Sequence, residues 1–270
     1  MKTHPFRNAL PPTLFMITVL LLWELTTWAF KIHEYILPGP SKIASAFFQN
    51  FSDLAMHAGV TLAEAGIGFV IANVVAILFA IVTTFTPTLA RAILPFAIAL
   101  KTTPVVAMAP LLLLWFGNGM APKIAAAVVI SFFPALVGSM RGFHALEVGE
   151  ADLFFVYGAS KWKMLKSLRF RRAAPFIFSA LKISSSLCVV GAIVGEFAGA
   201  NRGIGYVILV SSYHLETVKM FAALAWAAVG GVLLYGILAM IDRRIVFWAK
   251  DPTDEGRLES PLSAQSTLRR

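Results

Sequence analysis

The chain has 270 residues, of which 58% are hydrophobic and only 14% are charged. Water-soluble domains carry about 25% charged residues, so this composition excludes a soluble globular domain. It equally excludes a disordered chain, which could not leave so much apolar surface in water. The single cysteine, Cys188, excludes an intramolecular disulfide and a cysteine-based zinc site. We therefore expect a protein whose surroundings are lipid.

Long uncharged segments predict an all-α, polytopic membrane protein with six transmembrane helices. A helix needs about 20 apolar residues to cross the hydrocarbon core of a bilayer. The first segment is long and lacks the small-residue cleavage site of a signal peptide. The third contains Pro95, Pro104 and Pro110, which we expect to kink it. The expected spans are residues 13–30, 65–90, 92–116, 124–140, 175–195 and 220–241.

The distribution of Lys and Arg predicts that both termini are cytoplasmic. Six spans put both termini on one side of the membrane, together with the turn at 86–91 and the segment 141–175. That side carries sixteen Lys and Arg residues and the opposite side carries five. Cytoplasmic loops are enriched in positive charge. Topology and anionic lipid therefore explain the net charge of +9 without nucleic acid as a partner.

Two tails and a short surface helix complete the expected organisation. Residues 1–12 form a cytoplasmic tail, residues 13–248 form the six-span domain, and residues 249–270 form a polar tail that we expect to be disordered. After the first span, prolines stop the helix and Ser41 is expected to cap an amphipathic helix over 42–54 on the outer surface.

The segment 141–175 is too long for a simple connection between spans. Gly158 interrupts it, and Ser160 can cap a following helix in which Trp162, Leu165 and Leu168 recur at a spacing of three. The pattern predicts a helix, a glycine turn and a second helix, with an aromatic tip. Glycine permits a positive φ and the close approach of another chain. Two interpretations stay open: the loop packs its apolar face beneath the bundle, or it docks another protein.

The loop resembles the signature loop of binding-protein-dependent ABC importer permeases. In that family the loop begins Glu-Ala-Ala and has a glycine six residues after the Glu. On this chain the acidic position is Asp152, the alanine positions are Leu153 and Phe154, and the glycine is Gly158. Three further segments resemble motifs of the nitrate/sulfonate/taurine-type branch, in the same order along the chain. They are Ile-Leu-Pro-Gly-Pro-Ser at 36–41, Pro-Leu-Leu-Leu-Leu-Trp-Phe-Gly at 110–117, and Gly-Ala-Ile-Val-Gly-Glu-Phe at 191–197 with Arg-Gly-Ile-Gly-Tyr at 202–206.

The resemblance implies a type I ABC importer with a MetI-like fold in a bacterial cytoplasmic membrane. Two copies of the permease would form the translocation path, and an extracytoplasmic binding protein would deliver a small polar or anionic solute. Two ATPase subunits would bind ATP and Mg. The sequence has no Gly-x-x-x-x-Gly-Lys-Ser/Thr phosphate loop, so we expect this chain to be no enzyme. The implied ATPase contacts are Asp152, Leu153, Phe154, Phe155, Tyr157, Gly158, Ala159, Ser160 and Trp162.

Charged residues inside the expected spans are candidates for the solute path, because burying a charge in lipid is costly. Glu24, Glu64 and Lys182 lie near span ends, where a side chain can also pair or reach water. Lys101 lies nearer mid-depth and would suit an anionic solute. The histidines lie far apart, so we expect no metal site. The expected path residues are Lys101, Met108, Trp115 and Phe116, and the expected binding-protein contacts are Glu196, Arg202, Gly203 and Gly205. A second interpretation stays open, in which Glu196 and Arg202 pair with each other.

Two other classes stay open from the residues alone. A gradient-driven carrier or channel commonly has inverted repeats and paired intramembrane acids, and neither is visible in the sequence. A membrane-embedded enzyme needs clustered nucleophile, base or metal ligands. Ser184, Ser185 and Ser186 lie beside Lys182, but no His or acid partner is evident near them.

Overall fold

The computed structural model describes residues 5–147 and 149–248, and every regular element in these two ranges is helical. The expected C-terminal tail, 249–270, lies outside the described residues, and the expected N-terminal tail falls partly inside the first helix. The elements are α1 (Pro5–Ala29), α2 (Pro40–Gln49), α3 (Phe51–Phe85), α4 (Pro87–Thr102), α5 (Val105–Phe116), α6 (Ala121–His144), α7 (Glu150–Val156), α8 (Lys161–Met164), the π-helical segment η1 (Leu165–Arg169), α9 (Phe170–Phe197), α10 (Ile204–Tyr213) and α11 (Thr217–Ile245).

Five helices of the described part are long and apolar enough to cross a membrane. They correspond to five of the six expected spans. The expected third span is two shorter helices, α4 and α5, with the break at Thr103 and Pro104. Proline lacks an N–H group and disfavours helical geometry at the residue before it. Pro95 and Pro110 lie inside α4 and α5 and do not interrupt them.

The centre of the molecule is built from α3, α6 and α9, which pack closely through small residues. Gly191 of α9 lies so near α6 that a Cβ atom there would be 2.6 Å from the Cα atom of Ala127. Toward the other end of the same seam, a Cβ atom on Gly142 would be 2.9 Å from the Cα atom of Ala173. Small residues allow the close backbone approach by which helices associate in lipid.

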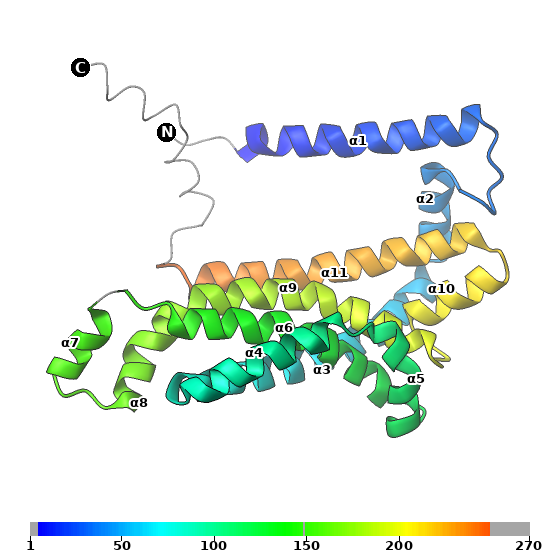
Figure 1. The fold of residues 1–270 in the computed structure, drawn as a ribbon. Coiled ribbons are helices and arrows are strands. Elements are labelled where there is room, and N and C mark those ends of the chain that lie inside the picture. Colours follow the sequence, from blue (N-terminus) through cyan, green and yellow to red (C-terminus); the bar gives the residue numbers. More distant parts are fainter. Residues whose placement is uncertain (1–4, 148, 249–270) are drawn as a thin grey trace, which may run out of the picture.

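The helices α1, α2 and α11 lie outside this core (Figure 1). The helix α1 is exposed along most of its length, and its Trp23 ring packs edge-on against Phe221 of α11 at 5.9 Å. The helix α11 packs against α9, where the Lys182 ammonium lies 2.8 Å from the Asp242 carboxylate. Of the two alternatives for Lys182, pairing or reaching water, the structure therefore shows a pair.

The start of α2 corrects one capping prediction. Gly39 is the N-cap and Pro40 is the first helical residue, so Ser41 lies inside the helix. Ser41 instead donates its backbone N–H and its hydroxyl to the two carboxylate oxygens of Glu24, at 2.9 and 2.7 Å. The expected helix over 42–54 is also divided at Asn50, beyond which α3 begins.

Short helices lie at both ends of the molecule. The elements α7 and α8 lie at one end, and α2 and α10 lie at the other (Figure 1). We call these the α7 end and the α10 end.

At the α7 end, α6 continues to His144 and the chain is helical again from Lys161 through η1 into α9. The segment that departs from the long helices is therefore 145–160, shorter than the expected 141–175.

Candidate functional site

The short helix α7 and the turn to α8 form a projecting elbow, residues 145–164, at the α7 end. The predicted helix, glycine turn and second helix are confirmed. Gly158 has φ +63°, and the Ser160 side chain accepts a hydrogen bond from the backbone N–H of Lys163 at 3.2 Å. The left-handed conformation costs most residues about 1–2 kcal/mol, which is why glycine suits the turn.

The tip of the elbow presents apolar side chains to its surroundings. Phe155, Tyr157 and Val156 are each about four-fifths exposed, at 82%, 81% and 80%. Leu153 is also exposed, and Phe154 is half-buried. Exposed apolar patches of this kind mark interaction surfaces.

The base of the elbow is packed, so both interpretations of the loop apply to different parts of it. Leu165 is 2% exposed and belongs to the same apolar cluster as Phe143 and Ala173. The Trp162 ring lies 5.5 Å from the Phe85 ring at the end of α3, although most of its surface is exposed. The tip is therefore free while the second helix is anchored to the bundle.

An arginine of α9 holds the first helix of the elbow. Arg172 donates to Glu150 of α7 from two guanidinium nitrogens, one of them at 3.0 Å, and pairs with Glu147 at 2.9 Å. The Arg172 hydrogen bond lowers the pKa of the Glu150 carboxyl below its ordinary value. This clamp joins the elbow to a long helix, so displacement of one is transmitted to the other. The sequence showed these charges but not their pairing.

The α10 end holds a second network, centred on Glu196. Its carboxylate accepts hydrogen bonds from the Thr61 hydroxyl at 2.6 Å and from the backbone N–H of Gly205. The Thr61 hydroxyl accepts from the Ile204 N–H at 2.8 Å, and His57 Nδ1 accepts from the Gly203 N–H at 3.0 Å. Side chains of α3 and α9 thus satisfy the unpaired N–H groups at the start of α10.

This network changes the expectation for the binding-protein contacts. Glu196 is 0% exposed, and Gly203 and Gly205 are buried, so none of the three is available for a surface contact in this conformation. A Cβ atom at either glycine would collide with the Glu196 carboxylate, which explains why both positions are glycine. Arg202 is exposed, and its role stays a prediction.

Buried charge at the α10 end also includes Glu64 and Lys123. Glu64 was expected to reach the surface from a span end, but it is 0% exposed. The Lys123 ammonium lies 3.8 Å from a Glu64 oxygen. In the described part of the chain, no three His, Cys, Asp or Glu side chains are grouped closely enough to hold a metal ion.

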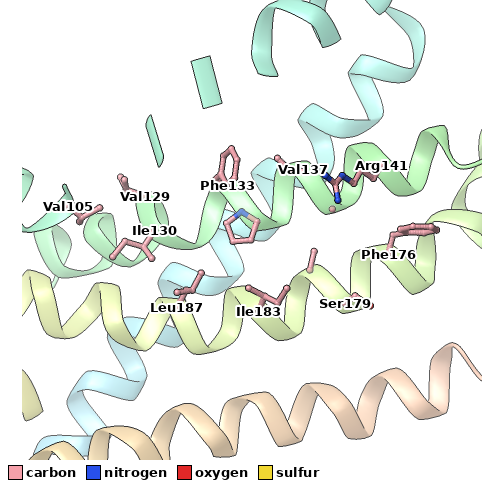
Figure 2. A pocket seen from close by; sticks show the side chains of 13 residues that line it. Val105, Val129, Ile130, Phe133, Val137, Arg141, Phe176, Ser179, Ile183 and Leu187 are labelled. Atoms are coloured by element: carbon pink, nitrogen blue, oxygen red, sulfur yellow. The ribbon is translucent and has the colours of Figure 1, made fainter. Parts of the chain in front are cut away.

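An apolar groove of about 570 Å³ runs between α6 and α9 (Figure 2). Arg141 and Ser179 add polar groups to its lining, and Val105 contributes from α5. Three of the expected path residues do not line it. Met108 is half-buried on α5, and Trp115 and Phe116 at the end of α5 are exposed. The Lys101 side chain lies outside the described part of the structure.

Comparison with known proteins shows to which family this helical architecture belongs. Residues 72–247 match the family model described as "Binding-protein-dependent transport system inner membrane component". The chain is 31% identical to a probable ABC transporter permease protein of Haemophilus influenzae, over 80% of this chain and 88% of that protein. It is 30% identical to the formylaminopyrimidine transport permease protein ThiX of Halalkalibacterium halodurans, over 90% of this chain and 97% of that protein. The fold resembles a chain of the inward-facing MetNI methionine ABC transporter with a TM-score of 0.57 and 17% identity, over 74% of this chain and 96% of that one.

Proposed function

Because this chain belongs to the family of binding-protein-dependent transport system inner membrane components, we propose that its elbow couples the membrane helices to a separate ATPase subunit. The chain is the permease subunit of an ABC importer. We therefore no longer consider a gradient-driven carrier or channel, or a membrane-embedded enzyme. In the complete importer, ATP and Mg are bound by the ATPase partners.

The exposed apolar tip on an anchored base is the observation that carries this proposal. The tip supplies a surface that a groove on a partner can enclose, centred on Phe155 and Tyr157. The base transmits movement, because α8 continues through η1 into α9 and Arg172 ties α7 to the same helix. Closure of the ATPase subunits would therefore displace α9 and its neighbour α6.

The remaining parts of the importer follow from the family. We propose a pair of permease copies, an extracytoplasmic binding protein at the α10 end, and both termini in the cytoplasm of a bacterium. The positive charge at the α7 end supports that orientation. The exposed faces of α1 and α5 leave apolar surface for a second copy, with Leu114 78% and Trp115 66% exposed.

The solute is proposed to be a small polar molecule. Relatives of this chain are named as transporting formylaminopyrimidine, riboflavin, aliphatic sulfonates, taurine and nitrate. Each of these solutes carries a polar group, and several of them are small anions. The binding protein would determine most of the specificity for one of these solutes.

Co-purification of the cognate ATPase with two Gly158 variants tests the coupling role. No atom lies within 4 Å of a Cβ atom built at Gly158, so a larger side chain there projects outward and spares the internal packing. We expect Gly158→Trp to reduce recovery of the ATPase about tenfold or more. Gly158→Asn is the matched control, because Asn tolerates the left-handed conformation. Recovery of the ATPase with Gly158→Trp at the wild-type level would contradict the proposal.

A further inference from the structure

A pocket of about 630 Å³ opens at the α10 end between two loops. One loop joins α5 to α6 and contributes Asn118, Gly119 and Met120. The other joins α9 to α10 and contributes residues 199–202. Glu64 and Lys123 also line the pocket, from α3 and α6. Its volume lies within the range of about 300–1,000 Å³ that is typical of small-molecule sites.

Glu64 is the unusual member of this lining. Its side chain is 0% exposed and adjoins the Glu196 carboxyl, and no N–H or hydroxyl group of the described residues donates a hydrogen bond to its oxygens. The Lys123 ammonium at 3.8 Å is too distant for a hydrogen bond. A buried carboxylate without donors is costly, so the arrangement calls for a group that brings N–H donors.

The neighbouring charges point to the same class of group. The Glu196 carboxyl adjoins Glu64, but its own oxygens are engaged by Thr61 and Gly205. Two buried carboxyl groups therefore face one buried ammonium, that of Lys123, and a further N–H donor or cation beside them would allow both to ionise. Arg202 lines the pocket and is exposed, so a positive group also faces the pocket from its edge.

We propose that this pocket is an outer acceptor site for the transported solute, in which amino or amide N–H groups bind Glu64. An acceptor or anionic group on the same solute faces Lys123 and Arg202. This assignment rests on the proposed function and narrows its substrate class to solutes that carry N–H donors. Because the Glu64 oxygens are covered, binding requires the Lys123 side chain or one of the loops to move aside.

Protection of an engineered thiol tests the site in the full-length permease. Asn118→Cys places an exposed thiol in the lining, while the natural Cys188 is buried. Labelling by a maleimide is measured against two pairs of probes that differ in one amino group: taurine with ethanesulfonate, and 4-aminopyrimidine with pyrimidine. For at least one pair we expect the amino compound to protect at a concentration about tenfold lower than its partner.

Glu64→Gln in the same background should bring the two members of that pair to within about twofold of each other. Glu216→Gln is the matched control, because Glu216 is an exposed acid at the same end that does not line the pocket. The Glu216→Gln variant should distinguish the two members of the pair as strongly as the Asn118→Cys protein does. Size-exclusion profiles establish whether each variant is folded. If Glu64→Gln is not folded, the proposal is judged from the preference of the Asn118→Cys protein for the amino compound of each pair.

Three results would overturn the assignment: no protection by any probe, equal protection within both pairs, or discrimination that survives Glu64→Gln. Equal protection is also the outcome expected if Glu64 and Glu196 share a proton instead of binding a solute. The labelling needs neither ATP nor the ATPase. Failure of the site is therefore distinct from failure of the proposed function, which is measured by ATP-driven uptake in the reconstituted importer.

Discussion

Replacing Gly191 by alanine tests whether the close packing of α6 and α9 holds the bundle together. The added Cβ atom would lie 2.6 Å from the Cα atom and 3.0 Å from the backbone nitrogen of Ala127. Carbon atoms pack at about 3.5–4.0 Å, so the helices must separate by roughly 1 Å. Backbone atoms cannot rotate aside as a side chain can. We therefore expect a loss of about 1–3 kcal/mol in the free energy of unfolding.

Thermal unfolding of the purified protein in detergent, followed by size-exclusion chromatography, measures this loss. A change of 1 kcal/mol lowers the midpoint by about 2–4 °C in a domain of this size. Gly66→Ala is the matched control, because a Cβ atom built at Gly66 of α3 has no neighbour within 4 Å. Alanine there should be neutral or stabilising by up to about 1 kcal/mol. Equal midpoints for the two variants would refute the close approach of α6 and α9.

Three further predictions concern individual side chains. Because the pKa of Glu150 is lowered by its hydrogen bond from Arg172, the clamp is fully formed above the ordinary carboxyl pKa and is lost as the pH falls through the lowered value. Proteolysis of the elbow should therefore accelerate in acid, and Glu150→Gln should show the faster cleavage already at neutral pH. Lys182→Met should lower the free energy of unfolding by about 1.5–3 kcal/mol, whereas adding Asp242→Leu should restore most of it, since no unpaired charge is left; equal midpoints for the single and double variants would contradict this. Cys188 should react with a maleimide only after denaturation, because it is buried; rapid labelling of the folded protein would contradict its position.

The features that the sequence predicts correctly are governed by residues close together in the chain. The turn at Gly158 and the cap at Ser160 depend on a few neighbouring residues, and both are present. The prolines show the limit of local rules. Pro95, Pro104 and Pro110 all lie in one apolar segment, yet only Pro104 separates two helices. Pro104 follows two threonines, whereas Pro95 and Pro110 follow apolar residues.

The failed and the undecided predictions concern polar side chains whose partners lie on another helix. Ser41 was expected to cap α2, but the Glu24 carboxylate of α1 accepts its hydrogen bonds, and Gly39 is the cap. Lys182 lies near the inner end of its span, where pairing and reaching water were both open, and its partner is Asp242 of another helix. The residues of each pair are separated by 17 and 60 positions. Such pairs leave no signal in the sequence of a single span.

Glu196 shows why this limit matters most for function. From the sequence, Glu196 was expected at the outer surface, where it would contact the binding protein or pair with Arg202. The partner that changes this conclusion is Thr61, 135 positions earlier, whose hydroxyl donates to the carboxylate. Once both side chains are joined to the start of α10, Glu196 serves the packing of three helices and is not free to dock a partner. Glu64, one turn of α3 beyond Thr61, has no such hydroxyl donor, and this difference between two adjacent buried acids is the reason that we propose the second one as the ligand-binding acid.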